Sequence, residues 1–87
     1  MPEQQAVRDR VRRYILDTFL LGEPPDSLKD STSLLLTGIV SSLAMLELVA
    51  FLEHEFAVTM RPDDLAPEKL DSVDRIVSLV VERQAGA

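Results

Sequence analysis

The first 21 residues contain apolar side chains at helical spacing. Val7, Val11, Ile15 and Phe19 recur every four residues, which places them on one face of an amphipathic helix from about Glu3 to Leu20. The segment that follows, residues 22–26, contains a glycine and two consecutive prolines. Glycine suits the position just past a helix and proline cannot continue one, so the first helix is predicted to end here.

The middle of the chain carries the strongest helical pattern. Apolar residues there are spaced i, i+3, i+4, i+7 and i+11, which forms one stripe about three turns long. The stripe consists of Met45, Leu48, Val49, Leu52 and Phe56. Ser41 stands where an N-cap is needed, because its hydroxyl can accept a hydrogen bond from a free amide of the first turn. A second helix that begins close to Ser42, with this stripe in the core, is therefore predicted.

A third stripe lies near the end of the chain, with Val73, Ile76, Val77 and Val80 at positions i, i+3, i+4 and i+7. Residues 76–81 are rich in β-branched side chains, so a buried strand is the alternative. Ser72 or Asp71 could cap a helix here, and the polar residues 82–83 extend the pattern. These two features favour a helix.

The remaining segments are connections. Residues 22–40 show no sustained helical period, so we expect a long loop that is anchored by Leu34, Leu35 and Ile39. Residues 57–60 look extended, residues 61–64 read as a turn, and residues 67–70 are predicted to form a brief helical turn. The sequence thus predicts an all-α fold: a single domain over residues 1–87, built as a small four-helix bundle with three main helices and one short helix.

Length and composition exclude several classes of function. A chain of 87 residues has little room for an enclosed active site. It has no cysteine and only one histidine, which excludes disulfide frameworks, cysteine–zinc sites and multi-histidine zinc centres. No segment has the length and apolarity of a membrane span, and the first residues do not resemble a signal peptide. A cytoplasmic, monomeric protein is the expectation.

The charge is uneven along the chain. The formal net charge is −6, which argues against a nucleic-acid binder. Five basic and twelve acidic side chains follow residue 21. We therefore expect partners with basic docking patches, although much of this acid could simply solvate helix surfaces.

Residues 38–43 read Gly-Ile-Val-Ser-Ser-Leu and lie between the long loop and the middle helix. This segment resembles the prosthetic-group segment of acyl carrier proteins, which is usually Gly-hydrophobic-hydrophobic-Asp-Ser-Leu. The similarity extends over nearly the whole chain. Residues 30–35, the acidic end of the middle helix at 53–56, residues 63–65, and 72–73 with Ile76 all fall where carrier proteins have similar residues.

The resemblance implies a function. A phosphopantetheinyl transferase would attach 4'-phosphopantetheine from coenzyme A to Ser42, and the thiol of this arm would hold an acyl group as a thioester. The protein would then be a freestanding, non-enzymatic acyl carrier that delivers its cargo to partner enzymes of polyketide or fatty-acid-type biosynthesis. The Gly-Ile-Val-Ser-Ser-Leu form is similar to discrete carriers that serve polyketide pathways, including carriers of unusual units.

The motif departs from the family at one position, where Ser41 replaces the usual aspartate. Serine and aspartate are nearly equivalent as N-caps, so the helix start is expected to be kept. The substitution removes a negative charge at the helix N-terminus. It leaves open whether a generic transferase recognises the site and which serine is modified; the position relative to Leu43 favours Ser42.

The residues alone also suggest that Ser42 is acted upon rather than catalytic. A hydroxyl on the first turn of a helix is accessible to another enzyme and lies near amides that favour an attached phosphate. No neighbouring histidine or lysine in the sequence could activate it as a nucleophile. Two alternatives remain: a helical interaction module without a prosthetic group, in which both serines only cap the helix, and a carrier of aminoacyl or peptidyl groups.

The middle helix has a second face once its core stripe is removed. It combines leucines near the helix start with carboxylates further along, as a docking surface needs. The resemblance assigns this face to partner binding; a plain solvated face is the alternative. Its residues are Leu43, Leu46, Glu47, Ala50, Glu53 and His54. No chemistry is assigned to His54, or to Asp63 and Asp64, which we expect to be ordinary surface residues.

Overall fold

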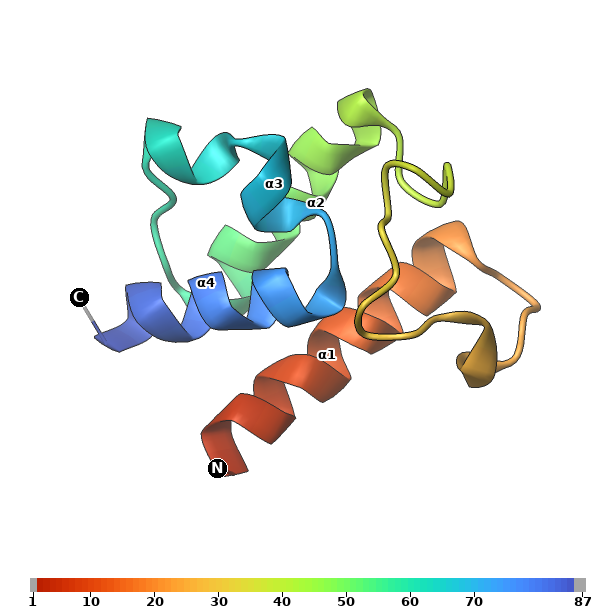
Figure 1. Ribbon diagram of the computed structural model, residues 1–87. Coiled ribbons are helices and arrows are strands. Elements are labelled where there is room, and N and C mark those ends of the chain that lie inside the picture. Colours follow the sequence, from red (N-terminus) through yellow and green to blue (C-terminus); the bar gives the residue numbers. More distant parts are fainter. Residues whose placement is uncertain (1, 86–87) are drawn as a thin grey trace.

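The computed structural model describes residues 2–85, and the side chains of residues 4–85, as an arrangement of helices without strands (Figure 1). The elements follow in the order α1 (Pro2–Phe19), η1 (Pro25–Ser27), α2 (Ser42–Phe56), η2 (Pro62–Leu65), α3 (Pro67–Leu70) and α4 (Val73–Ala85). The predicted small all-α bundle, with three main helices and one short helix, is confirmed. None of the described helices has the length and apolarity that a membrane span requires.

The three predicted apolar stripes meet in one core. Val11 and Ile15 of α1, Leu48 of α2, and Val73 and Ile76 of α4 are all fully buried. The stripe of α2 is buried except at its last residue, Phe56, which is half-buried at the edge of the core. Residues 76–81 lie within α4, so the helix is confirmed and the alternative of a buried strand is wrong.

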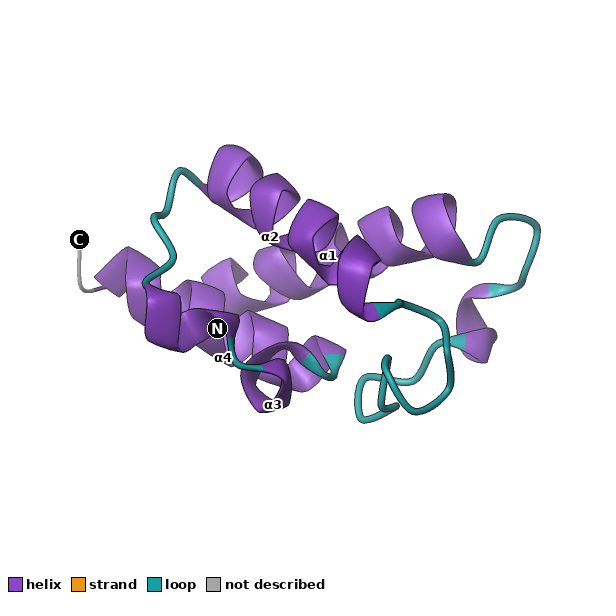
Figure 2. Ribbon diagram, turned by 90° about the horizontal axis from the view of Figure 1, so that it is seen from above, coloured by secondary structure: helices purple, strands orange, loops and turns teal. Residues whose placement is uncertain are grey.

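The long loop between α1 and α2 lies at one end of the bundle (Figure 2). Leu34 anchors it as predicted, and Leu28 and Val40 are buried as well. Leu35 and Ile39 are half-buried and pack against the core, as predicted. A hydrogen bond of 3.1 Å from the Val40 N–H to the Leu34 carbonyl closes residues 34–40 into a compact loop. The loop is therefore held in place although it has little regular structure of its own.

Asp71 holds this loop from the other side. Its carboxylate accepts hydrogen bonds from the Leu35 N–H (2.9 Å) and from the Ser33 hydroxyl (2.7 Å), while its carbonyl accepts from the Leu34 N–H (2.7 Å). The cap of α4 is the next residue, Ser72, whose hydroxyl accepts from the first turn of that helix at 3.2 Å. Of the two candidate caps, Ser72 caps α4 and Asp71 holds the loop.

Ion pairs fasten the loop and α4 to α1. Asp30 of the loop receives hydrogen bonds from Arg8 (2.8 Å) and Arg12 (2.7 Å), and Arg8 also reaches Asp74 of α4 (2.6 Å). Arg12 additionally donates to the Leu28 carbonyl at 2.6 Å. One side of α1 thus carries arginines that position the segment leading to α2.

The expectation that Asp64 is an ordinary surface residue is wrong. Its side chain is 1% exposed, and its carboxylate accepts two hydrogen bonds from the Arg83 guanidinium (2.8 and 3.1 Å) and one from the Arg61 N–H (2.9 Å). A buried carboxylate requires such partners, because desolvation penalises its charge. Asp64 therefore joins η2 to α4, whereas the neighbouring Asp63 is exposed as expected.

Candidate functional site

The start of α2 is built by Ser41. This residue has extended backbone angles (φ −77°, ψ 165°), and its hydroxyl accepts the Ala44 N–H at 3.1 Å. Its carbonyl accepts the Met45 N–H at 2.9 Å, the first hydrogen bond of the helix. The predicted N-cap and the predicted helix start at Ser42 are confirmed.

Ser42 is exposed on the first turn of α2. Within the described part of the chain, its hydroxyl makes no hydrogen bond, in contrast to the hydroxyl of Ser41. The backbone N–H groups of Ser42 and Leu43 belong to the first turn, whose amides have no partner inside the helix. Together with the helix dipole, these donors favour an attached phosphate. The residues present therefore fit a phosphate ester on the Ser42 oxygen.

A small apolar pocket lies beside Ser42. Its volume is about 90 Å³, and apart from the serine its walls are apolar side chains of the loop, α2, η2 and α3. The lining residues are Leu35, Ser42, Met45, Leu46, Val49, Leu65, Pro67 and Leu70.

The predicted partner-binding face of α2 is largely open. Leu43 is 77% exposed and Leu46 is 60% exposed, and Glu47, Ala50 and His54 are exposed as well. These side chains are available to a partner.

Two of the carboxylates on α2 are already engaged. Glu53, which the sequence placed on the exposed side, is half-buried, and its carboxylate accepts the Met60 N–H at 2.9 Å. Glu55 forms an ion pair with Arg10 of α1. Glu53 therefore contributes to fixing the segment after α2, and Glu47 is the carboxylate of this helix that is both exposed and without an ion pair among the described residues.

Two further exposed leucines, one of which lines the pocket beside Ser42, were not singled out by the sequence. Leu36 in the loop is 90% exposed and Leu65 in η2 is 42% exposed. Leu36 ends a run of three leucines, residues 34–36. A loop cannot direct three consecutive side chains into one core, which is the signal that could have drawn attention to it.

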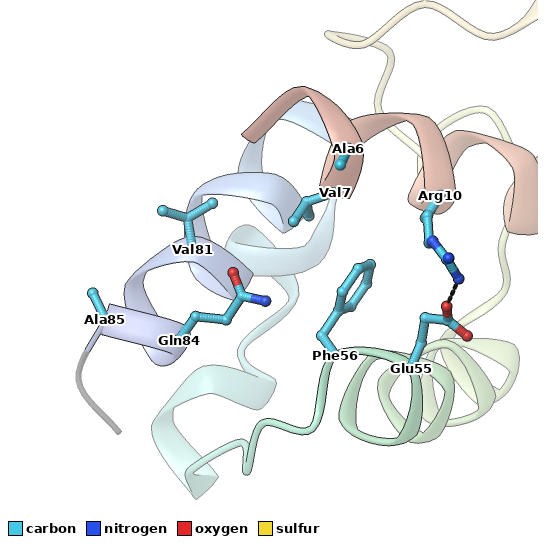
Figure 3. Close-up of a pocket in the computed structure, with 8 residues that line it drawn as sticks. All are labelled: Ala6, Val7, Arg10, Glu55, Phe56, Val81, Gln84 and Ala85. Carbon is cyan, nitrogen blue, oxygen red and sulfur yellow. Dashed lines mark hydrogen bonds and ion pairs between the residues drawn. The ribbon is translucent and has the colours of Figure 1, made fainter. Parts of the chain in front are cut away.

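A larger groove lies at the other end of α2 (Figure 3). It has a volume of about 650 Å³ and is open to solvent. The Arg10–Glu55 ion pair lies along one side of it, and Phe56 and Val7 contribute apolar surface. Phe56 is 14 residues after Ser42 on the same helix, which corresponds to about 20 Å. The groove is thus separate from the serine.

The described residues offer no other obvious chemistry. Among residues 4–85, no three histidine, aspartate or glutamate side chains gather as ligands for a metal ion. The exposed hydroxyl at the start of α2 is consequently the candidate site.

Comparison with protein families finds a match that covers most of the chain. The family model described as "Phosphopantetheine attachment site" matches residues 10–80, a range that includes the whole of α2 and the loop before it. No curated protein sequence matches the chain.

Proposed function

Because the chain belongs to the phosphopantetheine-attachment-site family, whose members carry a covalent 4'-phosphopantetheine, we propose that Ser42 bears this group and that the chain is an acyl carrier. The observation that carries the assignment is the difference between two adjacent hydroxyls. That of Ser41 is committed to the Ala44 N–H, whereas that of Ser42 is exposed and makes no hydrogen bond to described residues. An incoming enzyme reaches Ser42 without breaking the helix cap.

The attachment step follows from this exposure. The Ser42 oxygen bonds to the phosphorus next to the pantetheine of coenzyme A, and the bond from that phosphorus to the bridging oxygen breaks. Adenosine bisphosphate leaves, and the hydroxyl proton passes to a base of the transferase. The carrier supplies the oxygen, the amides of Ser42 and Leu43 stabilise the attached phosphate, and catalysis belongs to the transferase. The arm then supplies the thiol that this cysteine-free chain lacks.

The pocket beside Ser42 supports a short cargo. A volume of about 90 Å³ is smaller than the cavity of about 150 Å³ that holds a benzene molecule in an engineered protein. A long hydrocarbon chain does not fit such a space without moving α3 away from α2. The cargo is therefore a short acyl unit that stays in solvent, of the kind used in polyketide biosynthesis, rather than a growing long-chain fatty acyl group.

The chain itself is a non-enzymatic carrier that functions as a monomer in the cytoplasm. Its partners are the phosphopantetheinyl transferase and the enzymes that load and accept the acyl group. The composition and the exposed apolar and acidic side chains of α2 support this role. The transferase has to approach the first turn of α2, because the Ser42 oxygen that it modifies lies there.

The test is intact-mass spectrometry after co-expression with a broad-specificity phosphopantetheinyl transferase. The wild-type chain should gain one prosthetic-group increment, Ser42→Ala should gain none, and Ser41→Ala, the matched control, should still be modified. An increment that persists in Ser42→Ala and disappears in Ser41→Ala would move the attachment to the neighbouring serine. An unmodified wild type would contradict the proposed function.

A further inference from the structure

The short element η2 is held in an unusual way. Asp64 is buried, whereas Pro62, Asp63 and Leu65 of the same element are exposed. A surface segment is usually anchored by an apolar side chain that reaches the core, because charged side chains are rarely buried without a partner. In η2 a carboxylate has this position. An ion pair, instead of apolar burial, therefore fixes η2 to the bundle.

The partner of Asp64 lies on α4. The Arg83 guanidinium donates from Nε to Oδ2 (2.8 Å) and from Nη2 to Oδ1 (3.1 Å), which is the paired geometry of a guanidinium with a carboxylate. The Arg61 N–H donates to the same carboxylate at 2.9 Å, so the backbone just before η2 joins the contact. Although burial alone raises the pKa of Asp64, the hydrogen bonds from Arg61 and Arg83 hold it below its ordinary value of 3.8. The carboxylate is thus charged at neutral pH.

The segment that this ion pair holds is one wall of the pocket beside Ser42. Leu65 of η2 and Pro67 and Leu70 of α3 line the pocket together with residues of α2. The pocket has a volume of about 90 Å³, less than the cavity of about 150 Å³ that holds a benzene molecule. An acyl chain longer than a few carbons enters only if this wall moves away from α2.

Such a movement has to break the ion pair, because α4 cannot follow the wall. Figure 1 shows α3 beside α4, and α4 itself is embedded in the core. The fully buried residues of α4 are Val73, Ile76, Val77 and Val80. The Arg75 guanidinium also reaches the Glu68 carbonyl of α3 at 2.5 Å, but this contact is exposed, so water can replace it when the wall moves. The buried contact between Arg83 and Asp64 is the one that resists.

Resting on the function proposed above, we propose that the Arg83–Asp64 ion pair determines which acyl chains this carrier can bury. While the pair is formed, η2 and α3 keep their place, the pocket stays small, and a chain on the Ser42 arm remains in solvent. Without the pair, the wall moves and the pocket admits a chain of medium length. Arg83 and Asp64 are positioning residues, since they act through the wall that carries Leu65 and Leu70.

The proposal explains why the anchor of η2 is charged. A buried ion pair rarely stabilises a fold more than apolar side chains of similar volume would, so stability alone is a weak reason for it. Apolar contacts can slide and form again as a wall moves. A bidentate contact tolerates little displacement, because both hydrogen bonds depend on direction and a separated charge would remain buried. The ion pair therefore fixes the position of the wall more sharply than an apolar anchor would.

The experiment compares the wild type with the double variant Asp64→Asn/Arg83→Gln, which removes both charges together so that neither is left without its partner. The matched control is Arg10→Gln/Glu55→Gln, which removes the ion pair between α1 and α2 at the groove that is separate from Ser42. Each chain receives an acetyl- or octanoyl-phosphopantetheine arm from the corresponding acyl coenzyme A and a broad-specificity transferase. Octanoyl is larger than benzene and exceeds the present pocket.

The first measurement is the NMR signal of the methyl group of Met45, a lining residue of the pocket, in chains with isotope-labelled methionine. Met60, which does not line the pocket, is the internal reference. In the wild type and the control, the Met45 signal should be the same in the acetyl and octanoyl forms. In the Asp64/Arg83 variant it should differ between the two forms.

The second measurement is Tm. In the Asp64/Arg83 variant, Tm of the octanoyl form should exceed that of the acetyl form by at least about 4 °C, because a chain buried in the folded state stabilises it. In the wild type and the control the two forms should have the same Tm. A general loss of stability would lower Tm of both acyl forms equally. The dependence on acyl length therefore separates burial of the cargo from structural damage.

The outcomes are distinguishable. The proposal is overturned if the double variant is folded by circular dichroism and shows no dependence on acyl length, or if the wild type already shows one. If the double variant does not fold, Arg83→Lys takes its place, because an ammonium keeps the charge but lacks the paired donors; it should show the same dependence in weaker form, and its absence would equally refute the proposal. A wild type that accepts no arm, or accepts it at a residue other than Ser42, would instead defeat the proposed function and this inference with it.

Discussion

Ser41 and Ser42 are chemically identical neighbours, yet the structure gives them different roles, and removal of each hydroxyl should have different effects on stability. Ser41→Ala removes the acceptor of the Ala44 N–H. Loss of a serine N-cap costs about 1 kcal/mol, within a range of roughly 0.5 to 2. For a domain of this size, about 1 kcal/mol corresponds to a decrease in Tm of about 4 to 8 °C.

Ser42→Ala should have almost no effect on stability. Its hydroxyl is exposed and makes no hydrogen bond to described residues, and alanine has a slightly better helix propensity than serine. We expect a change in the free energy of unfolding of no more than about 0.5 kcal/mol in either direction. Ser41→Asp keeps the cap and adds a negative charge at the helix N-terminus, so it should stabilise the fold by about 0.3 to 1 kcal/mol at low salt.

The assay is urea denaturation of the chain without its prosthetic group, followed by circular dichroism, for the wild type and the three variants under identical conditions. Equal destabilisation by Ser41→Ala and Ser42→Ala would refute the division of roles, as would a Ser41→Ala variant as stable as the wild type. If Ser41→Asp stabilises the fold by the same amount at high salt as at low salt, the stabilisation does not come from the added charge, and the electrostatic part of the reasoning is refuted.

Two further predictions concern the cargo and the loop. Loading with acyl groups of increasing length, from acetyl to palmitoyl, should leave Tm nearly unchanged, because the pocket beside Ser42 is too small to bury the longer chains; a Tm that rises steadily with chain length would contradict a short cargo. Hydrogen bonds from the Leu35 N–H and the Ser33 hydroxyl hold the pKa of Asp71 below its ordinary value of 3.8. The charged Asp71 carboxylate therefore stabilises the fold fully at pH values above 3.8. This stabilisation is lost as the pH falls through the lowered pKa of Asp71 in the folded state. The Asp71→Asn variant should therefore be destabilised most, relative to the wild type, at neutral pH. The difference in the free energy of unfolding between the two, measured by denaturation from pH 7 to pH 2, should shrink in acid. A difference that stays constant over this range would show that the carboxylate charge is not involved.

Local patterns in the sequence were sufficient for most of the secondary structure. The spacing of Val11 and Ile15, of Leu48 and Leu52, and of Val73 with its neighbours predicted three buried stripes, because helical periodicity is a property of the local chain. Ser41 was recognised as a cap for the same reason: an N-cap hydroxyl bonds to an amide only three residues later.

Contacts between distant residues were harder to predict. Asp64 looked like a surface residue of a turn, and only the approach of Arg83, 19 positions later, makes its burial tolerable. Asp71 was a candidate helix cap in the sequence. In the structure its carboxylate instead accepts a hydrogen bond from the N–H of Leu35, which lies 36 positions earlier. In both cases the partner is remote in sequence, and nothing in the local pattern identifies it.

The sequence by itself determined the helices, the position of Ser42 on the first turn of α2 and the family resemblance of the surrounding segment, because each depends on residues within a few turns of one another. The tertiary structure alone decided that Glu53 is engaged rather than free, that Leu36 and Leu65 join the exposed leucines of α2, and that the pocket beside the serine is small. Exposure and charge balance at a surface depend on which elements pack side by side, and that is fixed by long-range contacts.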